Sequence, residues 1–343
     1  MNKEICDKIT LVIPTCDRPR YLHRLLSYYG AYGFPVRVLV LDSSLWMPEG
    51  ELLQLLRHDR VSYERLDHEV EIWSKIMAGL KMISTPYYVL CADDDFLTVR
   101  GIIQSAWFLD EHSDYAVAQG YHLSFRMDPD KQSDERFCWS TSTWPQESNE
   151  LPDPEGRLRF HFVHYQHTFY GVHRTDSGEM IHRDNVRLRI APFLSELLPS
   201  MIIAIQGKIK LLDVLYQLRE AIPNKAARPA NLVASVQNGT YQEKYAPFRE
   251  CVAKHLSGRT GMGTERATQI VDDAMFKYFT ICCRQTPSAA LSWRRPFHAN
   301  QIPWFDFRNS VDRPGSEYYD DFDGIRRHVL AFASCPAPQT VPG

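Results

Sequence analysis

Short apolar runs alternate with helix-compatible stretches over the first 125 residues, and this alternation limits the fold more than any other feature of the chain. The runs cover residues 9–15, 36–42, 61–66, 87–92 and 115–125. Between them, apolar residues recur at helical spacing. Most of the runs are continuously apolar, and the one at residues 61–66 is weaker. Because continuous apolar runs are typical of strands covered on both faces, we expect an α/β fold with a mostly parallel sheet flanked by helices.

Polar residues follow three of these predicted strands directly. They lie at residues 15–19, 42–44 and 93–96. Ligands on open parallel sheets bind beyond the carboxyl ends of the strands. The three segments are therefore the first places to expect a functional site.

The rest of the chain differs in composition from this first part. Residues 127–157 are rich in Asp, Ser, Pro and Glu, which predicts a long loop or insertion that is either a lid or without function. Helical patterning returns later, as in residues 267–283. We expect a nucleotide-binding and catalytic domain over residues 1–215 and a mainly helical C-terminal region over residues 216–343.

Composition and charge exclude several classes of protein. The 343 residues include 39 Lys and Arg against 42 Asp and Glu, a formal net charge of −3, so there is no excess of positive charge for nucleic acid. The segment before residue 9 is polar, and the first apolar run is too short for a signal-peptide core. No run approaches the roughly 20 apolar residues of a membrane-spanning helix. We expect a cytoplasmic protein with no transmembrane segment, at most peripheral to the inner face of the membrane.

Cysteine and histidine spacing argues against a structural metal centre. The eight cysteines are scattered without a C-x-x-C pair, which favours reduced thiols over a zinc ribbon or a disulfide framework. Five histidines between His161 and His182 lack the H-E-x-x-H arrangement. The sequence therefore predicts no structural zinc.

Three adjacent carboxylates, Asp93, Asp94 and Asp95, end the fourth predicted strand. Poorly solvated neighbouring carboxylates repel one another by roughly a few kcal/mol, so something must offset that cost. Mn²⁺ or Mg²⁺ would do so, because these ions prefer oxygen ligands and complete their shells with water and phosphates. The alternative is a solvated acidic turn that caps the next helix.

The acidic triplet belongs to a series of three motifs that resembles a known family. The segments ITLVIPTCDRP, VRVLVLDSS and TPYYVLCADDDF occur in this order within about the first hundred residues. Together they resemble the opening of nucleotide-sugar glycosyltransferases of the GT-A fold, and most closely a family 2 branch with an ADDDF motif. The resemblance implies that the acidic motif binds a metal ion and the donor nucleotide.

The resemblance also implies roles for individual residues, some with plain structural alternatives. Asp17 could instead form an Asx turn or a helix cap, Arg18 could be a solvated surface residue, and Lys75 could be an exposed lysine on an amphipathic helix. The implied roles are donor binding for Pro14, Thr15, Asp17, Arg18, Asp42, Lys75, Asp93 and Asp94, with Asp95 as the most direct metal ligand and Asp93 beside it. Asp42 has few evident structural duties at the end of a buried strand, which favours contact with the base or ribose.

A second segment resembles the part of such enzymes that holds the catalytic base. In PFLSELLPSMIIAIQGKIKLLD, Glu196 lies at the place of the family's acidic residue, ahead of a G-K-I strand at residues 207–209. Inverting transfer needs a general base for the acceptor hydroxyl, so Glu196 is the predicted base. The alternative is an ion pair with Arg187 or Arg189. The segment HTFYGVHR resembles the strand beside the sugar and acceptor, which implies contacts from Tyr170, Gly171, His173 and Arg174.

The sequence thus predicts a metal-dependent, inverting glycosyltransferase that uses Mn²⁺ or Mg²⁺. The donor expected first is a UDP-sugar, and the acceptor is a saccharide or another hydroxyl compound in surface glycan assembly; the sequence leaves the oligomeric state open. A nucleotidyltransferase on the same fold is an alternative, although the turn PTCDRPR has no glycine to cradle a triphosphate. A non-catalytic protein that binds sugar or nucleotide is the other.

Overall fold

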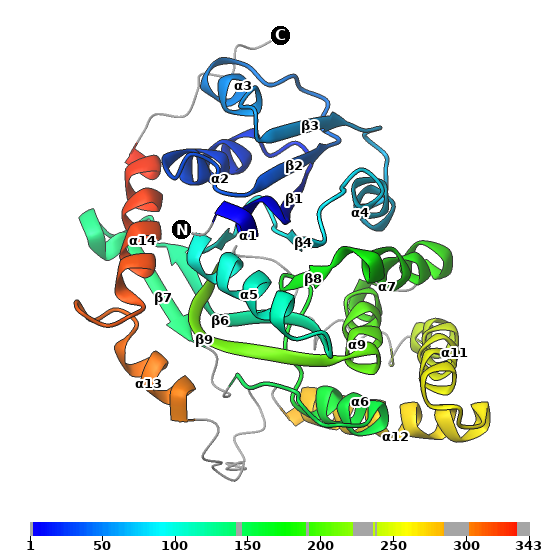
Figure 1. Cartoon of the computed structure of the whole chain (residues 1–343). Helices are drawn as coiled ribbons and strands as arrows, with labels where there is room; N and C mark the ends of the chain where they lie inside the picture. Colours follow the sequence, from blue (N-terminus) through cyan, green and yellow to red (C-terminus); the bar gives the residue numbers. More distant parts are fainter. Residues whose placement is uncertain are drawn as a thin grey trace.

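The computed structural model describes residues 3–141, 146–189, 192–221, 236, 239–284 and 302–334. The first part alternates strands with helices, as the apolar runs predict (Figure 1). Its elements are α1 (Lys3–Asp7), β1 (Ile9–Thr15), α2 (Pro19–Ala31), β2 (Arg37–Asp42), α3 (Gly50–Leu56), β3 (Val61–Arg65), α4 (Ile72–Leu80), β4 (Tyr87–Leu90), β5 (Phe96–Leu97), α5 (Val99–Glu111) and β6 (Tyr115–Met127).

The sheet has nine strands and is mixed. Its order is β3-β2-β1-β4-β8-β6-β9-β5, and β7 (Phe137–Thr141) pairs with β6. The first four strands in this order are parallel, whereas β8 (Val172–Arg174) runs antiparallel to both of its neighbours and β9 (Lys208–Glu220) runs parallel to β6. The predicted α/β sheet with flanking helices is confirmed, and its parallel character is strongest in the N-terminal half.

β1 shows why the apolar runs are continuous. Leu11 and Ile13 pack with α2 and α5 on one face of the sheet, while Val12 packs with α4 on the other face. Both faces of the strand are therefore buried, and apolar residues occupy consecutive positions. The polar residue inside it, Thr10, is hydrogen-bonded to the Thr85 hydroxyl at 2.7 Å. The parallel register then places Thr15 opposite Asp42, so the polar residues that follow the strands meet at one edge.

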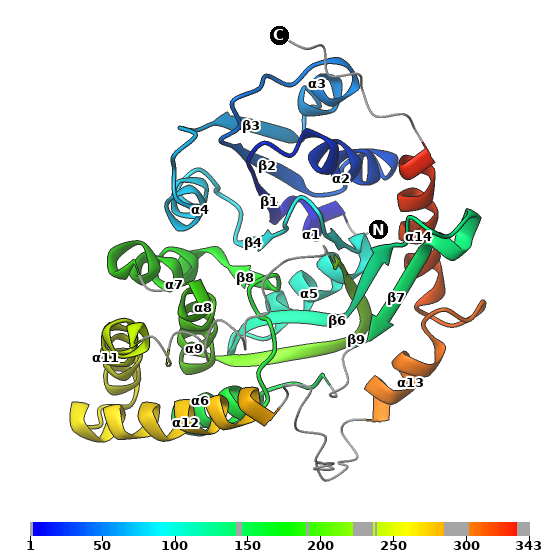
Figure 2. The same ribbon diagram turned by 180° about the vertical axis from the view of Figure 1, so that it is seen from behind.

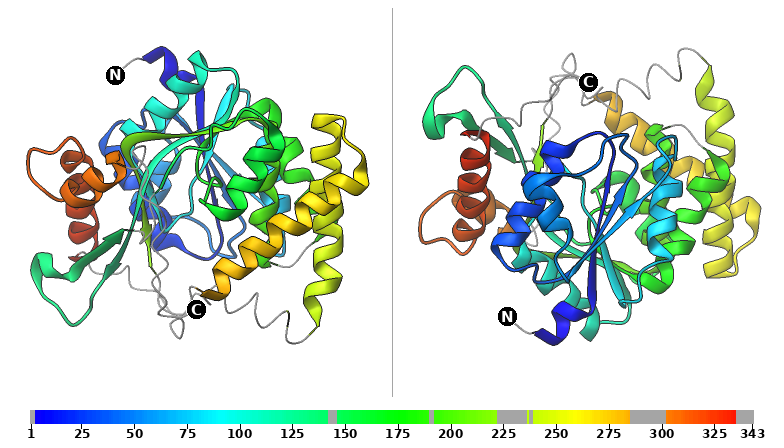
Figure 3. Two further views of the ribbon diagram at one scale, coloured as in Figure 1. Left: turned by 90° about the horizontal axis from the view of Figure 1, so that it is seen from below. Right: turned by 90° about the horizontal axis from the view of Figure 1, so that it is seen from above.

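The remaining helices cover the second half of the sheet and its two sides. They are the 3₁₀ helix η1 (Ser133–Arg136), α6 (Pro154–Val163), α7 (Thr175–Leu188), α8 (Pro192–Ser195), α9 (Leu197–Gln206), α11 (Thr240–Thr260), α12 (Thr264–Arg284), α13 (Ile302–Ser310) and α14 (Tyr319–Ser334). Figures 2 and 3 show α11 and α12 beside α6, α7 and α9, with α13 and α14 on the opposite side of the molecule. None of the helices among the described residues is both long and apolar enough to span a bilayer.

Two segments differ in detail from the predicted organisation. The described part of residues 127–157, expected as a loop, contains η1, β7 and the start of α6. β9 continues to residue 220, past the boundary expected at residue 215. The C-terminal helices also fall into two separate groups, because α13 and α14 return to β9 and α2 instead of joining α11 and α12.

Candidate active site

A cavity of about 860 Å³ lies at the carboxyl edge of β1 and β4. Its other walls come from the first turn of α4, the end of α7 and the turn before α9. Seven of the predicted site residues line it: Pro14, Thr15, Arg18, Lys75, Asp93, Tyr170 and Glu196. The other seven do not: Asp17, Asp42, Asp94, Asp95, Gly171, His173 and Arg174. The structure thus brings residues from five separate segments together.

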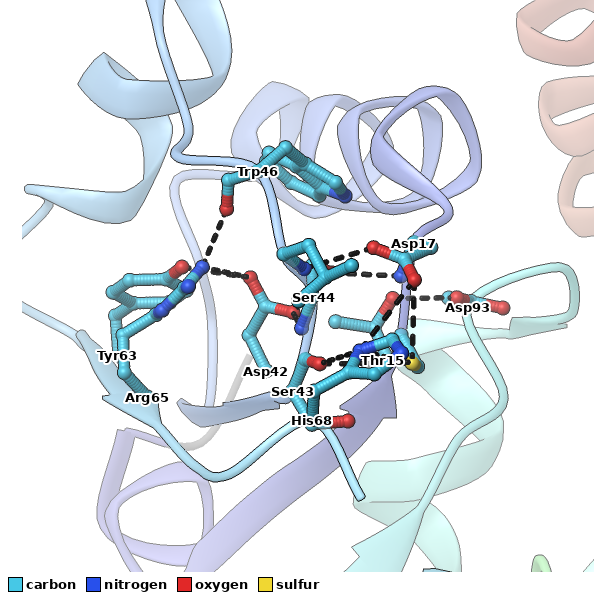
Figure 4. A network of polar contacts seen from close by, with 12 residues as sticks. Thr15, Asp17, Asp42, Ser43, Ser44, Trp46, Tyr63, Arg65, His68 and Asp93 are labelled. Atoms are coloured by element: carbon cyan, nitrogen blue, oxygen red, sulfur yellow. Dashed lines mark hydrogen bonds and ion pairs between the residues drawn. The ribbon is translucent and has the colours of Figure 1, made fainter. Parts of the chain in front are cut away.

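Asp42 is fully buried behind this edge and has several structural partners. One carboxylate oxygen accepts hydrogen bonds from Ser44, and the other accepts one from the Tyr63 hydroxyl at 2.7 Å (Figure 4). Arg65 lies 3.6 Å from the same carboxylate. Burial and the adjacent Asp42 raise the pKa of Tyr63 to about 12. The sequence argument that Asp42 has few structural duties is therefore wrong.

Asp17 joins the turn after β1 to the turn after β2. Its backbone has a positive φ of 52°, and its backbone N–H donates to the Ser44 hydroxyl at 2.7 Å. Its carboxylate accepts a hydrogen bond from the backbone N–H of Leu45 at 2.9 Å, and His68 lies 3.6 Å away (Figure 4). The side chain therefore holds two turns of the site edge together.

Lys75 is buried and is not the exposed lysine that was the alternative expectation. Its ammonium group donates to the Thr15 carbonyl at 2.7 Å and to the Ser43 hydroxyl at 2.6 Å. Burial lowers its pKa. Glu71, which caps α4 by accepting from Trp73 and Ser74 N–H groups, sets where the helix begins. Lys75, in the first turn of α4, thus places a buried cation in the wall of the cavity.

Arg18 bridges two carboxylates of the acidic triplet. One guanidinium nitrogen lies 2.8 Å from Asp93 and another lies 2.8 Å from Asp94. Asp93 also accepts a hydrogen bond from the Thr15 hydroxyl at 2.6 Å. Burial alone would lower the pKa of Arg18, but Asp93 and Asp94 outweigh it and raise the pKa overall. Part of the repulsion within the triplet is therefore offset by a protein cation.

Asp95 points towards β9. Its oxygens accept hydrogen bonds from the Gln217 side chain at 3.1 Å and the Glu220 backbone N–H at 3.0 Å, and Arg219 lies 3.6 Å away. Burial would lower the pKa of Arg219, but nearby negative groups, with Asp95 first, raise it overall. Asp95 therefore joins the acidic motif to β9, a strand more than a hundred residues later in the chain.

The acidic triplet suits a hard divalent cation in its chemistry. Carboxylate oxygens are the ligands that Mn²⁺ and Mg²⁺ prefer. Asp93 is the member of the triplet that lines the cavity, and Asp94 and Asp95 are buried beside it. Because Arg18 already balances Asp93 and Asp94, an ion at this place would compete with Arg18.

Glu196 lies between α8 and α9 and lines the cavity together with Ser195. Of the two arginines considered as its partners, Arg187 pairs with Asp184 at 3.0 Å, and Arg189 lines the same cavity. The Asn185 side chain donates to the Ser195 carbonyl at 2.6 Å and holds the turn against α7. The predicted base and the acidic motif thus share one cavity.

Tyr170 and Gly171 occupy the wall between the acidic motif and β6. Tyr170 lines the cavity, its ring lies 5.5 Å from the Arg219 guanidinium, and burial raises its pKa. Gly171 packs against β6, where a methyl group on its Cα would come 2.5 Å from Cγ2 of Val117. Glycine at this position therefore allows the chain to approach β6 closely.

We expect Gly171→Ala to lower the free energy of unfolding by about 1–3 kcal/mol, because Val117 is β-branched and cannot move aside easily. Denaturant unfolding measures the change. Gly258→Ala is the matched control, since Gly258 is an exposed position of α11 with nothing within 4 Å of the added methyl group. That control is expected to stabilise by up to about 1 kcal/mol. An unchanged midpoint for Gly171→Ala would contradict the close approach.

His173 and Arg174 lie away from the cavity. His173 is buried, stacks on Tyr88 and hydrogen-bonds the Thr168 carbonyl, and burial lowers its pKa to about 4. The Arg174 guanidinium donates to three backbone carbonyls, those of Leu109, His112 and Tyr115. These contacts hold the end of α5 against β8 and leave neither side chain facing a ligand in the cavity.

Sequence reasoning missed several residues around the cavity and the triplet. The main ones are Arg219 on β9, Trp73 on α4 and Asn185 near the end of α7. No local pattern singles them out, because each belongs to an ordinary amphipathic helix or strand. Only the tertiary structure, which places them close to the cavity or the acidic motif, identifies them as candidate site residues.

Comparison with known proteins supports the fold. No protein-family model matches the chain, and no curated protein matches its sequence. Among solved structures, that of S. aureus TarS residues 1–349 in complex with UDP superimposes with a TM-score of 0.50 and 15% identity, over 95% of this chain and 91% of that TarS fragment. The same TarS fragment in complex with UDP-GlcNAc gives the same TM-score, identity and coverage. The chain therefore has a GT-A-like α/β fold over nearly its whole length.

Proposed function

We propose that the chain is a metal-dependent, inverting glycosyltransferase that moves a sugar from a nucleotide-sugar donor to a hydroxyl acceptor. One observation carries the proposal: Asp93 of the acidic motif and Glu196 line the same 860 Å³ cavity at the carboxyl edge of the parallel strands. That edge is where α/β sheets bind ligands. The likeness to the TarS structures with UDP and UDP-GlcNAc supports a UDP-sugar as the first donor to test.

The donor would lie along the edge formed by β1 and β4. Thr15, Arg18 and Asp93 line this side of the cavity, and Lys75 supplies a buried cation beside Thr15. Asp17 and Asp42 would contribute indirectly, because they hold in place the turns after β1 and β2 that would face the nucleoside. Mn²⁺ or Mg²⁺, held at Asp93 with Asp94 and Asp95 beside it, would neutralise charge on the diphosphate.

Glu196 would act as the general base. Its carboxylate takes the proton from the acceptor hydroxyl as the acceptor oxygen forms its bond to the anomeric carbon. The bond between that carbon and the diphosphate oxygen breaks, and its electron pair leaves on the diphosphate. Attack from the side opposite the leaving group inverts the anomeric configuration. The acceptor class is a saccharide or another hydroxyl compound of surface glycan assembly.

A thermal-shift panel tests the proposal directly. Nucleoside diphosphates with Mn²⁺ should raise the melting temperature more than either component alone, because a specific ligand stabilises the fold by mass action. Nucleoside triphosphates and nucleoside monophosphates are the controls. Stabilisation by a triphosphate but not by any diphosphate would favour a nucleotidyltransferase. No stabilisation by any nucleotide would contradict the proposed donor site.

Arg18→Gln is expected to tighten Mn²⁺ binding in the absence of nucleotide by roughly 10-fold, or about 1.4 kcal/mol. The reason is that Arg18 lies 2.8 Å from both Asp93 and Asp94 and must release them before an ion can take their charge. The same variant should weaken binding of a nucleoside diphosphate, which loses a cation in the cavity. Electron paramagnetic resonance of free Mn²⁺ measures the first effect without any activity assay.

Arg20→Gln is the matched control, because Arg20 lies two residues away and is exposed. It should leave both affinities unchanged. Weaker Mn²⁺ binding in Arg18→Gln would show that Arg18 does not compete with the ion.

A further inference from the structure

A second group of metal-ligating side chains lies between α7 and α11, outside the candidate active site. Among the residues that the structure describes, Asp184, Cys251 and His255 each offer a ligand atom within 4.8 Å of the other two. Cys251 and His255 are four residues apart on α11, so they share one face of that helix. Asp184 on α7 meets this face, where its Oδ2 lies 2.8 Å from Nε2 of His255.

The three side chains are those that zinc uses. A thiolate, an imidazole and a carboxylate bind Zn²⁺ at about 2.0–2.3 Å, and sites with three protein ligands keep a fourth position for water. The ligand atoms lie close enough for small side-chain rotations to bring all three onto one ion. Cys251 is buried, while Asp184 and His255 retain 16% and 17% side-chain exposure, which leaves a path from solvent.

The surroundings of the group suit an ion as well. Arg187 pairs with the other oxygen of Asp184, Oδ1, at 3.0 Å. It thereby orients the carboxylate so that Oδ2 faces α11. Hydrogen-bond partners of this kind are typical of metal-ligating carboxylates. Because Arg187 is 60% exposed, its charge is largely screened by water.

We propose that Asp184, Cys251 and His255 form a zinc site that joins α7 to α11. Binding displaces the thiol proton of Cys251 to solvent, and water completes the tetrahedral shell. The site acts on the candidate active site through α7: Asn185, next to Asp184, lines the cavity and donates to the Ser195 carbonyl at 2.6 Å. An ion that holds α7 against α11 therefore stabilises the turn that carries Glu196.

A second group, Cys16, Asp17 and His68, provides an internal control. Its members also lie within 4.8 Å of one another, but Asp17 and His68 are already engaged with the backbone groups of Leu45 and Ser43. It lies at the edge of the proposed donor site. Any ion that binds there would be lost on changing Cys16 and kept on changing Cys251.

The experiment uses the full chain, stripped of metal with a chelator, and titrates it with Zn²⁺ and Co²⁺. One Zn²⁺ should bind per chain, and Co²⁺ should give the intense visible bands of tetrahedral coordination together with a thiolate-to-cobalt charge-transfer band. Cys251→Ser should abolish that band, and both it and His255→Gln should weaken Zn²⁺ binding by more than about 10-fold. Cys16→Ser should leave both properties unchanged.

Asp184→Asn keeps the shape of the side chain and is the second variant if loss of Cys251 impairs folding, which circular dichroism would reveal. It too should weaken Zn²⁺ binding by more than about 10-fold. The proposal is overturned if the wild-type chain binds no Zn²⁺, if Cys251→Ser retains the thiolate band, or if Cys16→Ser removes it. Thermal stabilisation by a nucleoside diphosphate with Mn²⁺ should persist in Cys251→Ser, which separates failure of this site from failure of the proposed donor site.

Discussion

Replacing Glu196 with Gln is expected to reduce glycosyl transfer by at least about 100-fold while nucleotide binding is preserved. The amide has nearly the shape of the carboxylate but cannot accept the acceptor proton. Glu196 lines the cavity from the turn before α9, whereas the acidic motif lines it from the other wall. Initial rates with a UDP-sugar and a hydroxyl acceptor measure the loss, and a thermal shift with UDP measures retained binding.

Glu69→Gln is the matched control for this result. Glu69 lines the same cavity, yet its side chain is 90% exposed, so the substitution removes the same charge without removing the proposed base. Transfer should stay within a few-fold of wild type. A Glu196→Gln enzyme of normal rate would place the base on another residue.

Replacing Asp93 with Asn is expected to remove metal-stimulated transfer, again by at least about 100-fold, which corresponds to roughly 2.7 kcal/mol of transition-state stabilisation. Asp93 is the carboxylate of the triplet on the cavity surface, and its charge is balanced by Arg18 at 2.8 Å. Rates measured against Mn²⁺ concentration test this. A variant with an unchanged Mn²⁺ response would contradict an ion at Asp93.

Asp95→Asn provides the comparison, since the family resemblance makes Asp95 the most direct ligand. Its contacts with Gln217, Arg219 and the Glu220 backbone favour an effect on stability, because hydrogen bonds to a buried charged group contribute about 1.5–3 kcal/mol. Denaturant unfolding of the two variants separates these roles. Loss of the Mn²⁺ response at Asp95 without loss of stability would assign the ion to Asp95.

The N-terminal half of the sheet was predictable because a strand that is buried on both faces appears in the sequence as a nearly continuous apolar run. Strands β1, β2 and β4 are mostly apolar where helices cover both faces, and polar residues follow them, whereas the edge strand β3 is only partly buried and contains Ser62, Glu64 and Arg65. β8 could not be found this way, since its three residues have too little pattern. The partner of β6 was also hidden, because β9 lies some ninety residues further along the chain.

The candidate site was predictable only in part, for a similar reason. Position after a strand identified Thr15, Arg18 and Asp93, which do line the cavity. The same reasoning could not distinguish residues that line the cavity from residues that are buried beneath its surface. Asp42 follows a strand too, but its oxygens are taken by Ser44 and Tyr63.

By itself, the sequence determined which segments become buried strands and which residues stand at their carboxyl ends, because hydrophobic burial acts on each segment through its own pattern. Only the tertiary structure decided what those residues meet. The decisive contacts join segments that are far apart in the chain. They are the pairs of Arg18 with Asp93 and Asp94, of Arg219 with Asp95, and of Asp184 with His255. Charge pairs and metal ligands depend on distances of a few ångströms, and those distances arise only when the packed layers bring separate segments together.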